Sequence, residues 1–331
     1  MARTRWSGPL GMLFHCLCAA GLALAAGAGW CQAYPAKPVR MVVPYVAGGS
    51  LDVISRLFAQ GMSEDLGQPF VVENRPGANG NVGTEQVARS PADGYTLAMV
   101  SAGTMAINPF LYVSMPFDTQ KDLAPVSLVA SGPMVLVVNG ALPIRTLNEL
   151  IAFAKANPGK LNVGSGGNGS LAHLSAEMMR SRMGISFTHV PYKGTSLAQN
   201  DLLAGHIQAM FDTLYTAVPF ITDGRTRALA VTSTKRSSVL PQVPTIAEVG
   251  IRDYTADAWS GLVGPVGLPR DIAARLQASI ARVAQREQVQ KRLVSVGSEA
   301  VASTPEQFAA TIQADRVKWA EVIKASGARI D

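Results

Sequence analysis

The sequence predicts an α/β protein of two lobes, in which each lobe is a mainly parallel sheet flanked by helices and crossover strands link the lobes. Short apolar runs alternate with amphipathic stretches, and this alternation restarts past residue 140. Two other apolar runs, residues 134–138 and 258–263, are placed to pass between the two sets. Repeated β-loop-α units form a parallel sheet covered on both faces, so two such sets predict two sheets.

The crossover runs also predict the boundaries of the lobes. We place lobe 1 at residues 34–133 and 258–331, and lobe 2 at residues 134–257, inserted into lobe 1. Open α/β sheets bind ligands beyond the carboxyl ends of their strands, so a cleft between the lobes is the expected site.

The elements of lobe 1 follow from β-branched runs and helical spacing. Residues 39–43 predict a buried strand that ends at Pro44. Apolar residues at helical spacing predict a helix from Leu51 to Asp65, with Gly67 just past its end. Two more strands are predicted at residues 70–72 and 95–100.

Lobe 2 shows the same alternation. Thr146 is placed to cap a helix that ends at Ala156, before an Asn-Pro-Gly stop. A short strand at residues 161–163 leads through a glycine loop into a helix from Ser170 to Met183. Further strands are predicted at residues 185–190 and 228–232.

The C-terminal part of the chain is predicted to be helical. Asp271 is placed to cap one helix that runs to about Leu293. A second helix begins after Thr304, where Thr-Pro-Glu-Gln forms a capping box with proline at the first helical position.

Residues 1–33 have the layout of a secretory signal peptide. Arg3 and Arg5 precede an apolar, alanine-rich run, and the segment ends in Cys-Gln-Ala, so we expect cleavage near Ala33. All three cysteines lie in this segment. We therefore expect an exported protein without thiols, which excludes cysteine-based metal sites, nucleophiles and redox pairs.

The charge of the chain argues against a nucleic-acid partner. The formal net charge is +6, and two of the basic residues belong to the predicted signal peptide. The remaining lysines and arginines do not gather on one segment, as they do in proteins that bind nucleic acid.

Two glycine loops, residues 44–50 and 164–170, each lie between a predicted strand and a predicted helix. Glycine lets the backbone approach a ligand, and a helix N-terminus offers unpaired N–H groups and a partial positive charge. Neither loop contains lysine or arginine. The pair therefore favours a small acid that is held by backbone amides, hydroxyls and water.

Signatures of catalysis are weak. Residues 164–169 match G-x-G-x-x-G, but no carboxylate follows the next strand, as dinucleotide binding would require. No G-x-S-x-G or H-E-x-x-H occurs, and Ser165 has no obvious base beside it in the sequence. His173 is placed to brace the second glycine loop. We expect no enzyme activity, no cofactor and no metal, with a dinucleotide-dependent enzyme as an alternative.

Several longer motifs carry a resemblance to a known family. They are Pro44-Tyr45 with Gly48-Gly49 and Asp52, residues 72–80, residues 93–97, residues 189–194 and residues 240–248. This set resembles the Bug-type solute receptors, which are the extracytoplasmic binding components of tripartite tricarboxylate transporters. The resemblance covers roughly residues 34–331.

The resemblance implies a periplasmic-binding-protein (Venus-flytrap) fold and a periplasmic location. It implies that a small carboxylate binds in the interlobe cleft through amides and bridging waters, and that the receptor, expected to be a monomer, then meets membrane permease subunits. Carried over position by position, the ligand-binding residues are Tyr45, Ala47, Gly48, Asp52, Ser101, Thr104, Ser165, Gly169, Ser170 and Asp212. A receptor that serves a signalling partner is the other alternative.

Overall fold

The computed structural model describes residues 34–330, of which residues 37–330 belong to one compact unit. The predicted signal peptide, residues 1–33, lies outside the described residues. Because that unit is not divided further, the predicted lobe boundaries stay a prediction, and we use lobe 1 and lobe 2 for those ranges. No helix within residues 34–330 is long and apolar enough to cross a membrane.

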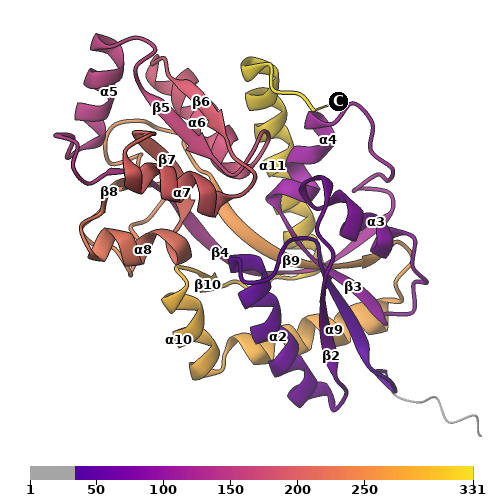
Figure 1. Ribbon diagram of the computed structural model, residues 1–331. Helices are drawn as coiled ribbons and strands as arrows, with labels where there is room; N and C mark the ends of the chain where they lie inside the picture. The colour runs from indigo at the N-terminus through magenta and orange to yellow at the C-terminus, as the bar shows by residue number, and fades with distance from the viewer. Residues whose placement is uncertain (1–33, 331) are drawn as a thin grey trace, which may run out of the picture. The chain divides into compact units, whose positions relative to one another are not determined.

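The sheet of lobe 1 is parallel at its outer edge (Figure 1). Strand β1 (Val39–Val43) pairs in parallel with both β2 (Phe70–Asn74) and β3 (Thr96–Ser101). Strand β9 (Asp257–Pro265) then pairs antiparallel with β3. The predicted strand at residues 39–43 is confirmed without a shift.

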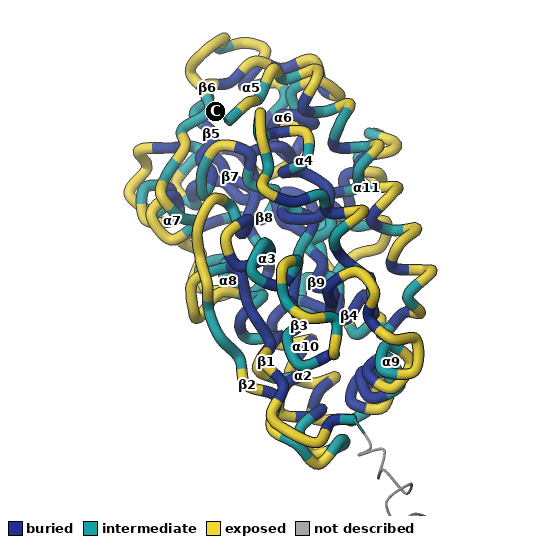
Figure 2. Tube along the Cα trace, turned by 90° about the vertical axis from the view of Figure 1, so that its right-hand side faces the viewer, coloured by how far each residue is buried: buried dark blue, intermediate teal, exposed yellow. Residues whose placement is uncertain are grey.

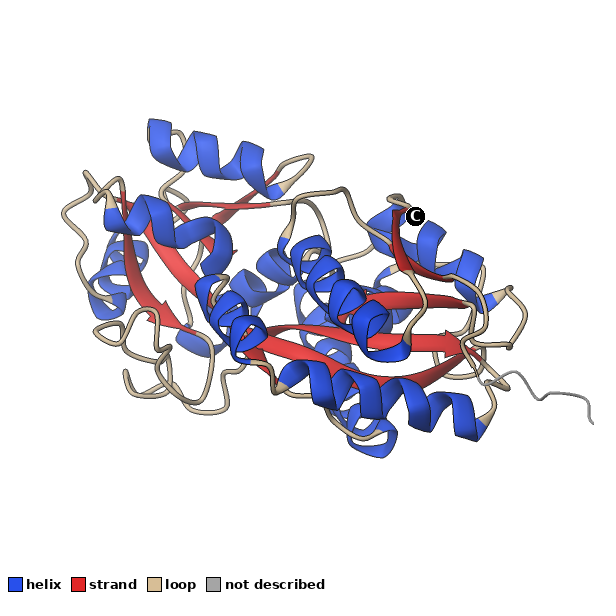
Figure 3. Ribbon diagram, turned by 90° about the horizontal axis from the view of Figure 1, so that it is seen from below, coloured by secondary structure: helices blue, strands red, loops and turns tan. Residues whose placement is uncertain are grey.

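Helices cover this sheet on both faces, as the view from below shows (Figure 3). Helix α2 runs Ser50–Leu66 and ends at Gly67, within one residue of the prediction at each end. The other elements of this part are η1 (Ala78–Gly80), α3 (Asn81–Ala88), the π-helix η2 (Gly103–Ile107) and α4 (Asn108–Leu111).

Two strands pass between the lobes. Strand β4 (Leu123–Asn139) pairs antiparallel with β9 along its first part. Its last part, from Met134, pairs with β7 (Ala209–Thr213) and β8 (Thr226–Val231). The predicted crossover runs are therefore the end of β4 and most of β9, and the two-lobed α/β fold is confirmed.

Lobe 2 repeats the plan on a smaller scale. Strand β5 (Asn162–Ser165) lies between β6 (Thr188–Pro191) and β7 and is parallel to both. Its helices are α5 (Leu147–Ala156), α6 (Leu171–Met183), α7 (Thr195–Ala204) and α8 (Leu214–Thr222). Thr146 caps α5 as predicted, and it forms a capping box with Glu149.

The C-terminal helices differ from the prediction at one place. The single helix expected from Asp271 to about Leu293 is wrong: α9 (Arg270–Ala284) and α10 (Glu287–Ser295) are separate. Asp271 lies in the first turn and does not cap the helix, because Pro269 is the N-cap. Helix α11 (Pro305–Ser326) begins at the predicted Thr304 capping box, and β10 (Glu299–Ala300) pairs with β4.

The buried core continues from one lobe into the other (Figure 2). One cluster joins Ile107 and Leu111 of lobe 1 to Leu174 and Phe211 of lobe 2. Trp319 of α11 belongs to the same cluster, and α11 contacts both β4 and α6. The glycine loops at the strand ends are therefore held on a packed frame.

Candidate binding cleft

A cleft of about 310 Å³ lies at the carboxyl ends of strands from both lobes. Lobe 1 contributes residues from the 45–54 segment, Asn79, residues 101–103, Asn108 and residues of the crossover strand β9. Lobe 2 contributes Met134, residues 169–172, Thr195 and residues 211–213. No lysine, arginine or histidine is among these lining residues. The cleft is therefore lined by backbone, hydroxyl, amide and apolar groups, with Asp212 as its one carboxylate.

The first glycine loop is braced by a charged pair beneath it. Gly48 has φ +87° and donates its N–H to Asp52 Oδ2 at 2.9 Å. The same oxygen accepts from Arg56 Nε at 3.0 Å, and Asp52 Oδ1 accepts from Asn74 at 2.9 Å. Burial alone raises the pKa of Asp52, but these hydrogen bonds outweigh it and hold the pKa below its usual value. Asp52 is thus an ionised brace of the loop and does not line the cleft.

Tyr45 and Ser101 form a polar edge of the cleft. The Tyr45 hydroxyl lies 3.0 Å from Ser101 Oγ and donates to Asn79 O at 3.3 Å. Burial raises the pKa of Tyr45, so its hydroxyl stays protonated. Thr104 lies below this edge, where its hydroxyl donates to Ser101 O at 3.1 Å and is fully buried.

The second glycine loop is braced by neutral groups. Gly169 N–H donates to His173 Nδ1 at 3.0 Å, so the predicted brace is present. The His173 ring stacks on His189 with 3.8 Å between centroids, and its Nε2 lies 3.6 Å from Glu177. Because Nδ1 accepts a hydrogen bond, the His173 proton sits on Nε2, toward the carboxylate.

Ser165 has a histidine beside it that the sequence did not reveal. Ser165 Oγ lies 2.7 Å from His189 Nε2 and also accepts the N–H of Gly167 at 3.2 Å. Burial and the neighbouring His173 lower the pKa of His189 to about 4, so the imidazole is neutral near pH 7. Ser165 has no exposed surface and does not line the cleft. The pair therefore stabilises the loop and is out of reach of a ligand in the cleft.

The two lobes touch directly at the edge of the cleft. Asn79 Nδ2 of lobe 1 donates to Asn168 O of lobe 2 at 3.3 Å. Gly169 packs so closely on α4 that a Cβ there would lie 1.8 Å from Leu111 Cδ2, and its φ is +71°. Only glycine fits this position, which makes it a contact point between the lobes.

Helix α6 points its first turn at the cleft. Its N-cap is Ser170, whose hydroxyl accepts the N–H of His173 at 3.2 Å. Leu171 and Ala172, which follow the cap, line the cleft. Helix α2 has a similar position, with Ser50 and Leu51 lining the cleft and no side-chain cap on its N-terminus. Both helices thus present N-terminal amides and positive dipole ends to one cavity.

Asp212 closes the lobe 2 wall at the end of β7. It is 1% exposed, and its Oδ1 accepts from Thr213 N at 2.7 Å and from Thr216 Oγ1 at 2.5 Å. Its Oδ2 lies 3.4 Å from Gln199 Nε2. Burial raises the pKa of Asp212 to about 7, against the two hydrogen bonds that lower it.

The structure brings some of the predicted residues into the cleft and places others behind it. The lining includes Tyr45, Ser101, Gly169, Ser170 and Asp212. Ala47 and Gly48 lie in the first loop between the lining residues Val46 and Gly49, and Asp52, Thr104 and Ser165 are buried supports. Sequence reasoning missed Asn79, although it stands inside the quoted motif of residues 72–80, and it missed Thr195.

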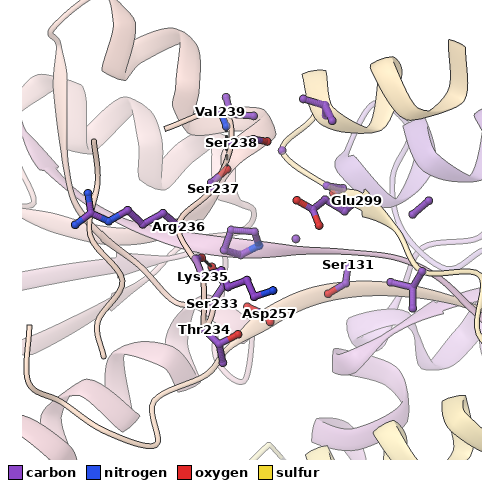
Figure 4. Close-up of a pocket in the computed structure, with 17 residues that line it drawn as sticks. Ser131, Ser233, Thr234, Lys235, Arg236, Ser237, Ser238, Val239, Asp257 and Glu299 are labelled. Carbon is purple, nitrogen blue, oxygen red and sulfur yellow. Dashed lines mark hydrogen bonds between the residues drawn. The ribbon is translucent and has the colours of Figure 1, made fainter. Parts of the chain in front are cut away.

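A second cavity, of about 270 Å³, lies beside the crossover strands. Figure 4 shows residues 233–239 on one side of it and Ser131 and Glu299 on the other. Its lining mixes Lys235 and Arg236 with Glu299 and Asp257, and burial raises the pKa of Asp257 to about 6. Charges of both signs and no glycine loop make this cavity a poorer match for a small anion than the cleft.

A two-lobed α/β fold with crossover strands and a cleft lined from both lobes is the arrangement of solute-binding proteins that close around a ligand. A sequence profile described as tripartite tricarboxylate transporter family receptor matches residues 54–328. The chain belongs to this family of receptors.

Individual relatives agree with this assignment. The chain is 38% identical to protein BugT of Bordetella pertussis over 298 residues, which is 90% of this chain and 91% of the relative. It superposes with a TM-score of 0.83 on Rpa4515 of R. palustris solved with adipate, at 34% identity, covering 90% of this chain and 100% of that one. For MatC of Rhodopseudomonas palustris with bound malate the TM-score is 0.79 at 31% identity, covering 88% and 100%.

The resemblance to Bug-type receptors is therefore confirmed, and so is the prediction that the chain is not an enzyme, since the family consists of receptors. The alternative of a dinucleotide-dependent enzyme is set aside on the same ground.

Proposed function

We propose that this receptor captures a small carboxylate in the interlobe cleft and delivers it, from the periplasm, to the membrane subunits of a tripartite transporter. The observation that carries the proposal is the cleft, in which two helix N-termini and two glycine loops face one cavity without a cationic side chain. Adipate and malate, which the two structural neighbours bind, are small carboxylates of the proposed kind.

In this proposal the polar lining makes the contacts and the buried residues keep the lining in place. The contact residues are Tyr45, Ser101, Gly169, Ser170 and Asp212, with the first loop at Ala47 and Gly48. Asp52, Thr104 and Ser165 act one layer further back, as supports of the loops and strand ends. Residues 1–33 serve as a signal peptide that is cleaved near Ala33, and the exported protein is a monomer.

Capture works by closure of the lobes over the ligand. The Asn79–Asn168 hydrogen bond and the Leu111–Gly169 contact already join the two rims. A ligand that contacts both lobes binds the closed arrangement better than an open one and so shifts the population toward it. Closure then removes the ligand from bulk water.

A thermal-shift screen of protein that starts at residue 34 tests the proposal. The panel holds mono-, di- and tricarboxylates, amino acids and aromatic acids, with NAD and ATP as controls. An acid at 100 times its Kd is expected to add about 2.7 kcal/mol to the free energy of unfolding. A shift with a nucleotide and none with any acid would contradict the proposal.

A matched pair of variants separates the two cavities. Tyr45→Phe removes the hydroxyl at the edge of the cleft and is expected to weaken binding about tenfold, the worth of about one hydrogen bond. Lys235→Ala changes only the second cavity and is expected to leave the acid-induced shift as it is. The reverse result would place the ligand beside the crossover strands.

A further inference from the structure

We propose that Asp212 binds the ligand as a neutral acid that donates its proton from Oδ2 to a ligand carboxylate, so that above neutral pH each anion enters the cleft together with one proton. The inference rests on the proposed function, because it assumes that a carboxylate occupies the cleft. It makes Asp212 a specificity-determining residue and couples capture of the solute to pH.

The hydrogen bonds of Asp212 leave one of its two oxygens available. Oδ1 is occupied by the Thr213 N–H and the Thr216 hydroxyl at 2.7 and 2.5 Å. Oδ2 has only a long contact among the described residues, 3.4 Å from Gln199 Nε2, and that amide makes its shorter bond, 2.9 Å, to Thr216 O. Asp212 is buried and lines the cleft, so Oδ2 is the oxygen placed to meet a ligand.

The charges around Asp212 do not favour its ionised form. Burial is the largest influence on the Asp212 pKa, which is about 7, and no charged group is among the influences on it. On the packed helices, Asp201 of α7 is bonded to Tyr192 and His206.

On α6 the charged group is Glu177, which is held by His173 and Arg180. Tyr45, which lines the same cleft from lobe 1, is a neutral phenol. An anionic ligand set beside Asp212 raises its pKa further, because two like charges in one site oppose each other. Above neutral pH, binding therefore takes up a proton.

The opposite assignment is that ionised Asp212 accepts a hydrogen bond from an ammonium or hydroxyl group of the ligand. The two assignments differ in sign. If Asp212 is a neutral donor, ligand affinity falls as pH rises. If Asp212 is an ionised acceptor, ligand affinity increases as pH rises. The isosteric change Asp212→Asn separates them, because an amide is permanently neutral and still offers an N–H donor.

The experiment is isothermal titration of protein that starts at residue 34 with adipate and with malate at pH 6.0 and pH 8.5. Both pH values lie above the ordinary pKa range of a carboxyl group, so the carboxyl groups of both ligands are largely ionised in both measurements. Titration of the ligand itself therefore adds little to the difference in affinity. The pKa of Asp212 is about 7 in the free protein and is expected to be much higher in the complex. The ligand therefore binds with full affinity below pH 7, and its affinity falls as pH rises above 7. The expected loss between these pH values is about 30-fold.

Proton uptake gives an independent reading. At pH 8.0, the heat of binding measured in phosphate is expected to differ from the heat measured in Tris. The expected difference is the one that corresponds to uptake of about one proton per bound ligand. Asp212→Asn is expected to bind within a few-fold of the original protein at pH 6.0 and more tightly than it at pH 8.5. Asp257→Asn is the matched control, because it neutralises another carboxyl of raised pKa that is partly buried and does not line the cleft, and it is expected to keep the pH dependence.

Each contrary result has a distinct meaning. Binding that does not vary with pH, or loss of binding in Asp212→Asn at both pH values, would overturn this inference and leave the proposed function standing. A pH dependence that disappears in Asp257→Asn would assign the proton uptake to Asp257 and the second cavity, and not to Asp212. No binding of any acid at pH 6.0, in the full panel of carboxylates, would overturn the proposed function and this inference with it.

Discussion

The two glycine loops have the same place at the cleft but are held by different chemistry. The first is braced by the ionised Asp52, which binds Gly48 N–H, Arg56 and Asn74. The second is braced by the neutral, stacked pair of His173 and His189. A similar backbone geometry thus depends on charge in lobe 1 and on uncharged imidazoles in lobe 2, so the loops respond differently to mutation and to pH.

The largest expected effect is a loss of ligand affinity when alanine replaces a glycine of the second loop, and the same change in the first loop is the control. Gly169→Ala places a Cβ 1.8 Å from Leu111 Cδ2 at φ +71°, so either the Leu111 side chain or the contact between the lobes has to shift. We expect ligand affinity to fall at least about 30-fold, as for about 2 kcal/mol of overpacking. Titration of the ligand found in the screen measures it.

Gly48→Ala is the control for this prediction. Gly48 has φ +87°, but a Cβ there meets nothing within 4 Å. We expect the backbone cost of about 1 kcal/mol in the free energy of unfolding and a loss of ligand affinity smaller than that of Gly169→Ala. Equal losses of affinity in both variants would show that the contact with Leu111 does not hold the lobes.

The next effect is a difference in acid sensitivity. The His189 imidazole has a pKa near 6.5 in the unfolded chain and about 4 when folded, so the unfolded state takes up its proton first. Stability is therefore expected to fall as pH drops from about 6.5 toward 4. Urea unfolding across this range is the measurement.

His189→Gln is expected to flatten this part of the profile, because glutamine keeps a polar group beside Ser165 but does not titrate. A profile that stays as steep in the variant would assign the effect to another group.

Asp52 is expected to affect the free energy of unfolding in a lower pH range than His189 does. Its pKa is lowered in the folded protein, so its contribution to stability is present above its unfolded value and is lost as pH falls through the folded one. Asp52→Asn is expected to cost about 1 kcal/mol at pH 7, since the bond from Gly48 to a charged oxygen is weakened. Chemical unfolding at pH 7 and pH 3 checks it, and the difference between the two proteins is expected to shrink at pH 3.

The smallest effect concerns the exposed partner of that carboxylate. The Arg56 side chain is 53% exposed, so Arg56→Gln is expected to lower stability by less than about 1 kcal/mol. A loss larger than that of Asp52→Asn would mean that the arginine, and not the carboxylate, holds the first loop.

Local signals in the sequence predicted most of the fold. Helix α2, helix α6 and the capping residues Thr146 and Thr304 lie within one residue of their predicted places, because caps, glycine stops and apolar spacing act within a few residues. The break between α9 and α10 was missed because neither glycine nor proline stands at Gln285 and Arg286.

The site was only half predictable for a different reason. A glycine loop predicts where backbone amides gather, but it does not say which side chains at a strand end turn inward. Thr104 and Ser165 turn into the core, whereas Ser101 and Ser170 face the cleft. The Ser165–His189 pair depends on two parallel strands lying side by side, which no local pattern records.

Trp259 gives the crossover an optical reporter of its own. Protein that starts at residue 34 contains two tryptophans, Trp259 and Trp319. Trp259 lies in β9, with its indole N–H donating to Asp315 of α11 at 2.7 Å and its ring set edge-on to Phe308. With Trp319 replaced by phenylalanine, the remaining emission comes from the strand that links the lobes, so each capture event is followed in real time without a dye.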